Sequence, residues 1–526
     1  MECQKRKFVA AASCEGEGGR RRRMTDRFSN LPDQVAHVII SFLTMADLAR
    51  LSYVSKCWRE LCLSSPVFNF NEYNCIGNAD MCDSKLRLLN ILERFLSLRA
   101  DHKIQRFRFD WHLPPPKNNQ GSSSSSCGCR DVYYRVMSCV QKVVRCNVEQ
   151  LELNLLGLGE PNLNFPSSIF LCESLKSLSV YTNRAILRAP SSSSSFSSNL
   201  KELQLLNVVI ADDEGFFKWI SCSCKCIRKL GLDHTYMIKN LNIESSSLER
   251  LSLSYPQPDL DTLNISCENL QLLSISLCPD SPCMTSLNIF APNLKKLWWE
   301  GNLMNHPNLR KFQSLESAEV CFDSVGKVSL EKTQKFKSTL IELKTRVDDF
   351  EPLSEVFHGL RINEVLILNE AAIKVMFKLE GSMPVSFNNV QSLRMNIGCV
   401  TDEIVPSMVS VLRGMPYLRI LYIKRCPPFH ELESNKCGFD IGYWKLQNLG
   451  FINRLEFFSI EILDWYNVVE LARYVLECAQ KLKKGVIICS AQNLEEVKRK
   501  LEKCKMISTA AIVFKERPKS ERRLLF

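Results

Sequence analysis

The sequence lacks the features of a membrane or secreted protein. Over its 526 residues, no apolar run reaches the roughly 18 residues that a membrane-spanning helix needs. Residues 1–23 carry charges and glycines where a secretory signal would have its hydrophobic region. We therefore expect a protein that does not enter membranes and that resides in the nucleus, the cytoplasm or both. The 24 cysteines fit such a compartment if they are reduced, so we expect no disulfides.

The residue patterns of the common enzymes are also missing. The chain has no Gly-x-Ser-x-Gly nucleophile motif, no glycine-rich phosphate loop leading to Lys-Ser/Thr, and no His-Glu-x-x-His. Its 7 histidines are scattered without the spacing of a catalytic triad or a metal site. The densest thiols, Cys127-x-Cys129 and Cys222-x-Cys224-x-Cys226, differ from the duplicated Cys-x-x-Cys pairs of zinc sites. We predict a non-catalytic protein with neither a metal nor a cofactor.

The net charge of +11 is concentrated at the two ends of the chain. Residues 1–30 hold 8 basic against 4 acidic residues, and residues 481–526 hold 13 against 5, so the ends carry +12. The other 450 residues hold 47 basic against 48 acidic residues. A nucleic-acid groove needs a basic stripe, so this balance argues against a nucleic-acid partner. The run Arg20–Arg23 fits either a nuclear-import signal or a solvated basic tail, and both interpretations stay open.

What the sequence does contain is a repeated leucine motif, Leu-x-x-Leu-x-Leu and close variants, from about Val148 to Ile423. Its second apolar position recurs at steps of 21 to 28 residues, with one step of 47 that is close to two ordinary steps. These positions are Leu151, Leu178, Leu203, Leu230, Leu251, Leu273, Leu297, Ala318, Val365, Leu393 and Leu421. The pattern resembles the leucine-rich repeat, whose units bury their apolar side only by stacking on their neighbours. The resemblance implies an α/β solenoid built on a curved parallel sheet.

The same repeats predict a binding surface. Side chains alternate along a strand, so the residues between and beside the motif's leucines should line the concave side of the solenoid. Exposed aromatic and arginine residues are frequent among binding hot spots. Trp298 stands where earlier repeats have serine, although a register error of one residue would exchange it with Trp299. We predict that the target-binding surface includes Tyr181, Asp233, Trp298, Glu300, Arg394 and Tyr422.

Upstream of the repeats, residues 26 to about 70 predict three short helices. Pro32 and Asp33 favour the start of the first helix, and Thr44 and Ser55 are predicted to cap the second and the third. An apolar stripe follows helical spacing in the first helix: Val35, Val38, Ile39, Phe42 and Leu43. Three helices of this size cannot bury all their apolar groups by themselves, so a partner is implied.

This segment resembles an F-box of the plant type. The matching residues are Asp26-Arg27-Phe28-Ser29-Asn30-Leu31-Pro32-Asp33, Ile39-x-x-Phe42-Leu43, Asp47-Leu48-x-x-Leu51 and Val54-Ser55-Lys56-x-Trp58-Arg59. Cys57 departs from the basic residue usual in the family, which weakens at most a peripheral contact. The resemblance implies docking on a Skp-type adaptor, which bridges to a cullin ubiquitin ligase. The docking residues implied by the match are Leu31, Pro32, Ile39, Leu43, Leu48, Leu51, Val54 and Trp58.

Behind the repeats, residues 470–479 and 482–487 resemble the C-terminal FBD module found behind leucine-rich repeats in plant F-box proteins. Periodicity there predicts strands at 455–463, 485–489 and 510–514, with helices at 467–482 and from 493 onward. We therefore expect five parts in the chain. These are a disordered basic tail (1–24), the F-box (25–70), a linker and capping segment with a Ser-rich loop (71–135), the leucine-rich repeats (136–430) and an FBD-like domain (431–526).

Together these features predict a substrate-recognition subunit of an SCF-type (Skp-cullin-F-box) ubiquitin ligase. The F-box would bind the adaptor, and the repeats would bind an unknown target protein. The alternative is a non-ligase leucine-rich-repeat scaffold or ligand sensor, in which the three helices only close one end of the solenoid. The two hypotheses differ in one expectation, because a docking F-box should leave Leu43, Leu48 and Trp58 uncovered by the chain's own arc.

Overall fold

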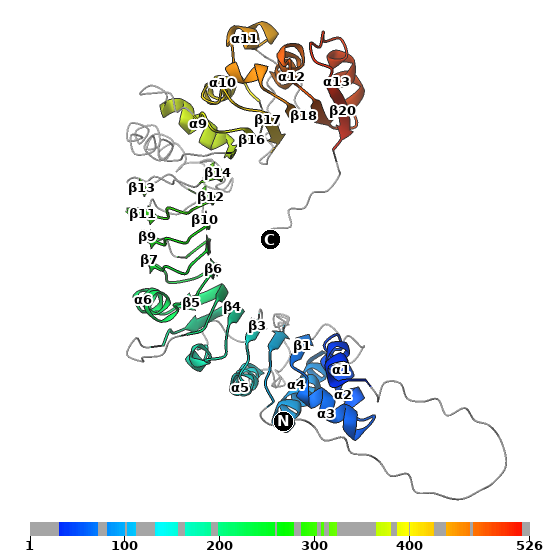
Figure 1. Cartoon of the computed structure of the whole chain (residues 1–526), viewed down its shortest axis with the longest axis vertical. Coiled ribbons are helices and arrows are strands. Elements are labelled where there is room, and N and C mark those ends of the chain that lie inside the picture. The colour runs from blue at the N-terminus through cyan, green and yellow to red at the C-terminus, as the bar shows by residue number, and fades with distance from the viewer. Residues whose placement is uncertain are drawn as a thin grey trace, which may run out of the picture.

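The computed structural model describes residues 31–71, 81–99, 102–111, 132–155, 164–190, 198–257, 260–277, 286–301, 307–309, 315–322, 364–379, 387–398, 400–425, 438–462 and 467–517. These residues form an open arc (Figure 1). Three short helices lie at one end of the arc, and the last strand lies at the other. The predicted class, an N-terminal three-helix segment followed by an α/β solenoid, is confirmed.

The N-terminal helices are α1 (Asp33–Ile40), α2 (Met45–Ser52) and α3 (Lys56–Ser64). Thr44 Oγ1 accepts a hydrogen bond from the backbone N–H of Asp47, and Ser55 Oγ accepts one from Trp58, both at 3.2 Å. These contacts confirm the two predicted helix caps. The helix α2 packs against α4 (Met81–Leu98) and against the first strand, β1 (Val67–Asn71), so the helical end is joined to the sheet.

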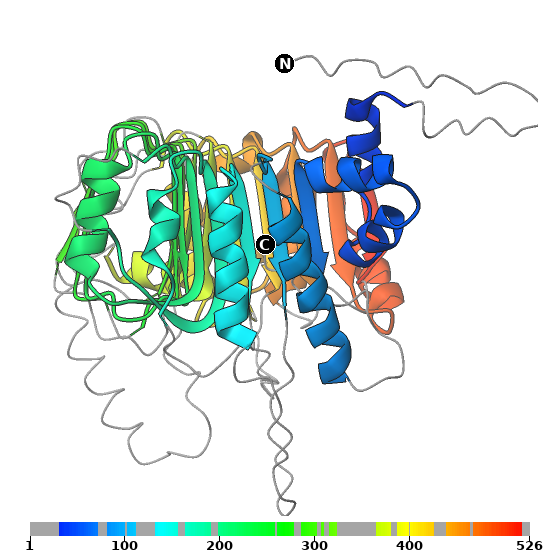
Figure 2. The same ribbon diagram turned by 90° about the horizontal axis from the view of Figure 1, so that it is seen from below.

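A parallel sheet of 16 strands lines the inner side of the arc (Figures 1 and 2). It begins at β1 and continues in chain order. The following strands are β2 (Arg106–Asp110), β3 (Gln150–Asn154), β4 (Ser177–Leu187), β5 (Glu202–Ile210), β6 (Lys229–Asp233), β8 (Arg250–Ser254), β10 (Leu272–Ser276), β12 (Lys296–Gly301), β14 (Ser317–Phe322), β15 (Val365–Asn369), β16 (Ser392–Ile397), β17 (Ile420–Arg425), β18 (Phe457–Ile462), β19 (Lys484–Cys489) and β20 (Ala511–Glu516).

The outer side of the arc is covered partly by helices and partly by a second sheet. The helical segments are α5 (Val132–Arg145), η3 (Ser167–Leu171), α6 (Asp213–Ser223), α9 (Glu370–Leu379), α10 (Val405–Arg413), α11 (Ile441–Leu446), η5 (Gly450–Asn453), α12 (Asn467–Cys478) and α13 (Leu494–Leu501). The second sheet is parallel and has four strands: β7 (Asn240–Glu244), β9 (Thr262–Ser266), β11 (Ser286–Phe290) and β13 (Pro307–Leu309).

The length of each repeat accounts for this division. Between Leu230 and Ala318 the motif recurs every 21 to 24 residues, and the return segments there are strands. From Leu203 to Leu230 the step is 27 residues, and the return segment contains α6. A strand rises about 3.3 Å per residue and a helix about 1.5 Å, so a helix needs about twice as many residues to cross the same thickness. Short repeats therefore return as strands.

The buried side chains at the second apolar position of the motif stand opposite one another on neighbouring strands, and we call them the apolar column. One of the residues predicted for it, Val365, is wrong. Ala318 of β14 lies opposite Leu366 of β15, not opposite Val365, so Val365 faces the other side of the sheet. The misassignment arose because residues 365–368 are all apolar, and a one-residue shift reverses the two faces of a strand. The strands β14 and β15 are direct hydrogen-bonded neighbours, so no other strand stands between them in this sheet.

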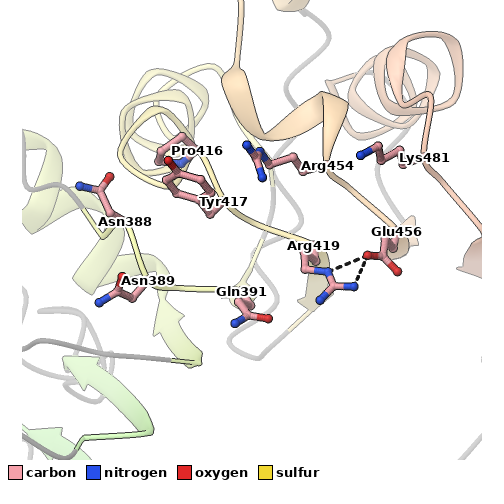
Figure 3. A pocket seen from close by; sticks show the side chains of 9 residues that line it. All are labelled: Asn388, Asn389, Gln391, Pro416, Tyr417, Arg419, Arg454, Glu456 and Lys481. Carbon is pink, nitrogen blue, oxygen red and sulfur yellow. Dashed lines mark hydrogen bonds and ion pairs between the residues drawn. The ribbon is translucent and has the colours of Figure 1, made fainter.

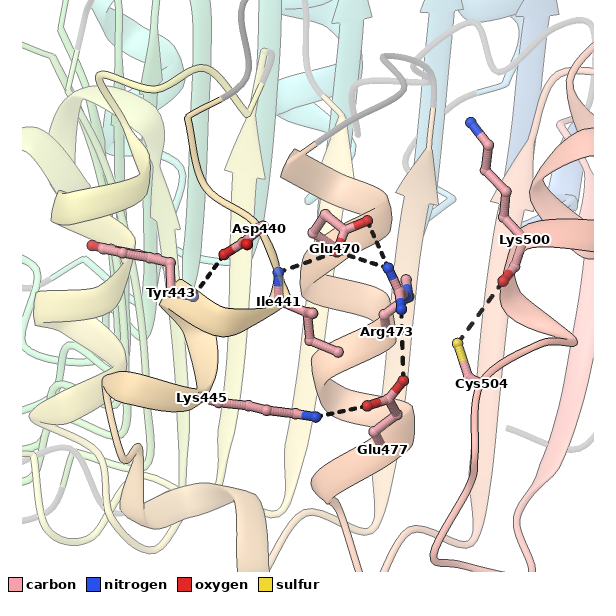
Figure 4. Close-up of polar contacts among 9 residues, drawn as sticks. All are labelled: Asp440, Ile441, Tyr443, Lys445, Glu470, Arg473, Glu477, Lys500 and Cys504. Carbon is pink, nitrogen blue, oxygen red and sulfur yellow. Dashed lines mark hydrogen bonds and ion pairs between the residues drawn. The ribbon is translucent and has the colours of Figure 1, made fainter.

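The C-terminal segment extends the same sheet. The strands β18, β19 and β20 and the helices α12 and α13 confirm the predicted elements there. The predicted boundary between the repeats and the FBD-like domain, at 430/431, falls between β17 and β18. These two strands are hydrogen-bonded neighbours in one sheet, so the sheet does not mark this boundary, which remains a prediction. One ion pair joins two outer helices, since Lys445 of α11 lies 2.8 Å from Glu477 of α12; within α12, Glu477 also lies 3.9 Å from Arg473 (Figure 4).

Adjacent tryptophans on β12 allow a direct test of this register. Trp299 is 8% exposed and packs in the core, whereas Trp298 is 43% exposed on the inner surface. Trp299→Ala is expected to lower the free energy of unfolding by about 3–5 kcal/mol, since it leaves a cavity. Trp298→Ala is expected to cost about 1 kcal/mol or less. Urea denaturation followed by circular dichroism measures both, and equal losses or the reverse order would contradict the register.

Candidate functional site

The three N-terminal helices expose an apolar surface. Six large apolar side chains within residues 35–54 are exposed, and the most exposed, Phe42, reaches 83%. On α1 the inward positions are Ala36 and Ile40, and all members of the predicted apolar stripe except Leu43 face outward. Isolated exposed apolar residues are ordinary, but a cluster in three short helices indicates a binding surface. We call the following six residues the exposed helical surface: Val35, Val38, Ile39, Phe42, Tyr53 and Val54.

The predicted adaptor-binding residues differ in exposure. Three are exposed, namely Pro32, Ile39 and Val54. Three are half-buried, namely Leu31, Leu43 and Leu51. The remaining two, Leu48 and Trp58, are only 1% and 7% exposed. Of the full set, therefore, Pro32, Ile39 and Val54 are the residues most open to a partner.

The expectation that Leu48 and Trp58 are left uncovered is wrong. Both belong to the continuous hydrophobic core of the chain, which also includes Leu89 of α4 and Phe68 of β1. The physical reason is that α2 packs against α3, against β1 and against α4, which lies in the predicted linker, so the chain itself covers the inner side of these helices. Leu43 is half-buried and packs against the same core.

Four residues of the exposed helical surface were absent from the predicted docking set. Val35, Val38 and Phe42 lay in the predicted stripe of the first helix, so their helical spacing was the signal that could have identified them. Tyr53 lies in the turn after α2, where no sequence pattern marked it.

The second surface is the inner side of the 16-stranded sheet. The six residues predicted there are all exposed or half-buried, because they alternate with the buried leucines of the motif. They fall into three separate pairs. Arg394 and Tyr422 are direct partners on adjacent strands, Trp298 and Glu300 lie two residues apart on β12, and Tyr181 and Asp233 lie on β4 and β6 with Leu206 of β5 between them. The strands that carry Trp298 and Arg394 are three positions apart in the sheet. At about 4.8 Å per strand this is roughly 14 Å, so the six residues do not form one small site.

The pair Arg394 and Tyr422 belongs to an aromatic cluster. The guanidinium of Arg394 lies 5.3 Å from the centre of the Tyr422 ring, and the rings of Tyr422 and Phe457 lie 5.2 Å apart. Half-buried Ile367 of β15 and Ile420 of β17 stand on the same side of the sheet as this cluster. Sequence reasoning missed Phe457 because its strand was assigned to the FBD-like domain rather than to the repeat surface. This part of the sheet has the arginine-and-aromatic composition of a hot spot for protein binding.

The pair Tyr181 and Asp233 is polar. Burial raises the pKa of Tyr181, and the carboxylates of Glu152 and Asp233 raise it further, so the phenol stays neutral near pH 7. Asp233 Oδ1 is 2.7 Å from Nδ1 of His234. On β12, Glu300 accepts a hydrogen bond from Ser276 Oγ at 3.3 Å. These groups can donate and accept hydrogen bonds, and they suit recognition better than chemistry.

No cluster of metal-ligating side chains occurs in the part of the chain that the structure describes. Of the predicted dense thiols, Cys224 is buried between exposed Cys222 and Cys226, and Cys127 and Cys129 lie outside the described residues. Burial raises the pKa of Cys224 to about 12 and that of Cys267 to about 11, so both remain protonated and unreactive. Among the described helices, none has the length and apolar character needed to cross a membrane.

These features define a class: an F-box-like helical segment joined to a leucine-rich-repeat solenoid. The F-box-like family matches residues 28–68. The family described as "FBD-associated F-box protein At5g56370, LRR repeats" matches residues 136–298. The chain is thus similar to F-box proteins with leucine-rich repeats over the three N-terminal helices and over the repeats up to residue 298.

Relatives from Arabidopsis thaliana extend this similarity over most of the chain. A putative F-box/FBD/LRR-repeat protein, At4g03220, is 24% identical over 495 residues, which cover 90% of this chain and 91% of the relative. A putative F-box/LRR-repeat protein, At3g49150, is 25% identical over 498 residues, and this aligned region covers 91% of this chain and 69% of the relative. The predicted resemblance to plant F-box/leucine-rich-repeat proteins with an FBD module is confirmed.

The burial of the cysteines predicts their order of reaction. In the folded protein, exposed Cys57, Cys222 and Cys226 should react with a maleimide, while buried Cys224 and Cys267 should react only after unfolding. Mass spectrometry of peptides after a short pulse of reagent measures this order. Early labelling of Cys224 or Cys267 would contradict the packing described here.

Proposed function

We propose that the protein is the substrate-recognition subunit of an SCF-type ubiquitin ligase. The exposed helical surface would bind a Skp-type adaptor, and the adaptor would connect the chain to a cullin. The observation that carries this proposal is the F-box-like match at residues 28–68, together with the apolar side chains that the same residues leave exposed. An exposed apolar surface of this kind is stabilised when a partner removes it from water.

The proposed mechanism is positional. The inner surface of the sheet would hold a target protein, while the helical end is held by the adaptor at one end of the arc (Figure 1). Tethering in this way raises the effective concentration of the target's lysines near a ubiquitin-charged enzyme elsewhere in the complex. No side chain of this chain needs to take part in the transfer. Residence in the nucleus, the cytoplasm or both remains part of this proposal.

Burial of Leu48 and Trp58 favours a second candidate, a scaffold or ligand sensor that works without a ligase. In that function the three helices would serve only as the end cap of the solenoid, and α4 would provide the packing that a cap needs. The two functions differ in what they require of the outward side of α1 and of the turn that follows it, which holds Phe42. A cap needs no exposed phenylalanine there, whereas adaptor docking does.

A double substitution, at Val38 of α1 and at Phe42 in the turn after α1, separates the two functions. Val38→Ala with Phe42→Ala should reduce co-purification of a Skp-type adaptor at least tenfold, because truncated anchor residues cost about 1 kcal/mol or more each. Both side chains are exposed, so the thermal unfolding midpoint should change little. Leu446→Ala, at a residue as exposed on α11, is the matched control and should leave adaptor binding unchanged. Wild-type binding by the double variant would refute adaptor docking through this surface and favour the cap.

A further inference from the structure

A side-chain hydrogen bond recurs at the turn before the inner strands. Four residues before the central apolar position of a repeat, a serine or asparagine side chain donates to a backbone carbonyl of the preceding repeat. Asn199 donates to Glu173 at 2.9 Å, and Asn293 donates to Glu268 at 2.9 Å. The same bond occurs, at 2.6 to 2.9 Å, from Ser174, Ser247 and Asn269. These short side chains bind the turns of successive repeats to one another.

Three consecutive repeats near the C-terminal end break this pattern. The equivalent positions before β17, β18 and β19 hold Tyr417, Arg454 and Lys481. Arg454 does not bridge the turns but lies over the ring of Tyr417, at 4.6 Å from its centre. The central residues Leu421, Phe458 and Gly485 are in register, so the three replaced positions stand side by side on adjacent strands, about 5 Å apart.

The replaced side chains line a pocket of about 950 Å³ (Figure 3). Gln391, Arg419 and Glu456 complete one wall, and Asn388, Asn389 and Pro416 lie at the other end. The pocket opens at the edge of the sheet where the strands begin, so it is separate from the inner surface. Its volume is at the upper end of the range for ligand sites, about 300–1,000 Å³, which is more than a single small ion fills.

The charges in this pocket do not cancel. Glu456 accepts hydrogen bonds from Lys483 at 2.5 Å and from Arg419 at 2.6 Å, and these bonds lower the pKa of Glu456. The one carboxylate of the lining is therefore ionised and already paired with two cations. Among the described residues, no carboxylate pairs with Arg454 or Lys481. Arg454 is also held in place by the Tyr417 ring, which reduces the entropy that it would lose on binding.

We propose that this pocket binds an anionic side chain, a carboxylate or a phosphate, carried by an extended peptide. Arg454 and Lys481 would pair with the anion, and Tyr417 would position the Arg454 guanidinium. The polar lining and the volume suit a peptide segment better than an apolar small molecule. That the peptide belongs to a target protein rests on the proposed function, whereas the preference for an anion does not.

The test uses the full chain and three fluorescein-labelled peptides: hexaglutamate, a peptide of three phosphoserines separated by glycines, and hexaglutamine. At low salt, at least one of the two anionic peptides should bind ten times more tightly than hexaglutamine in fluorescence anisotropy, and added salt should weaken it. Binding of both shows that any anionic side chain suffices, and binding of the phosphopeptide alone identifies phosphate as the ligand. Failure of both anionic peptides to exceed hexaglutamine overturns the proposal.

Substitutions distinguish this pocket from a general effect of a basic surface. Arg454→Gln and Lys481→Gln should each weaken the anionic peptide at least fivefold. Lys503→Gln, at an exposed lysine just beyond α13, is the matched control and should change affinity less than twofold. Tyr417→Phe should retain binding, and Tyr417→Leu should weaken it, because only an aromatic ring supports the guanidinium. Equal losses from Lys503→Gln and Arg454→Gln would overturn the assignment.

Adaptor co-purification, measured on the same preparations, keeps this inference separate from the proposed function. Arg454→Gln should bind the adaptor as the wild type does, since the pocket and the exposed helical surface lie near opposite ends of the arc (Figure 1). If the variant with Val38→Ala and Phe42→Ala loses adaptor binding but still binds the anionic peptide, the loss comes from the exposed helical surface and leaves the pocket assignment unchanged.

Discussion

The structure depends on burial of one apolar column between neighbouring parallel strands. Each repeat contributes a leucine such as Leu203 or Leu230 that lies directly opposite its counterpart on the next strand. A single repeat leaves this side chain in water, and stacking removes it, at roughly 25 cal/mol per Å² of apolar surface. The ends of the stack have only one neighbour, so they need another form of cover. At the N-terminal end, β1, α4 and the three short helices provide it.

This requirement explains why the N-terminal helices have two different sides. Their inner side, with Leu48 and Trp58, is part of the chain's own core and holds the helices on the end of the sheet. Their outer side has no such role, yet it carries Val38 and Phe42 exposed to solvent. Helical periodicity keeps these sides apart, since the eight residues of α1 turn Ala36 and Ile40 inward and Val38 outward. The packing of α2 on α4 and β1 also joins these helices to the sheet that carries the inner surface.

The same column leaves the other positions of each repeat free to differ. The inner surface changes from serines in the middle repeats, such as Ser252 and Ser274, to Arg394, Tyr422 and Phe457 toward the C-terminal end. The turn position four residues before the central apolar residue also changes toward the C-terminal end, from asparagine and serine to Tyr417, Arg454 and Lys481. Both changes occur where the outer layer consists of helices. The arginine and aromatic cluster of the inner surface and the replaced turn residues therefore lie in the same part of the sheet, near its C-terminal end.

The sequence by itself determined the periodic features of this protein. The recurring leucines gave the parallel sheet and its two faces, the caps at Thr44 and Ser55 gave two helix starts, and the Leu-Pro segment with its stripe indicated the F-box-like helices. These follow from local spacing, since neighbours in a repeat lie at a constant distance along the chain. The tertiary structure decided what depends on distant contacts. It buries Leu48 and Trp58 in the chain's own core, turns Leu366 rather than Val365 toward the interior, and brings Tyr417, Arg454 and Lys481 together at one pocket. Local spacing carries no information about which separate segments pack together, because burial is a property of the assembled chain.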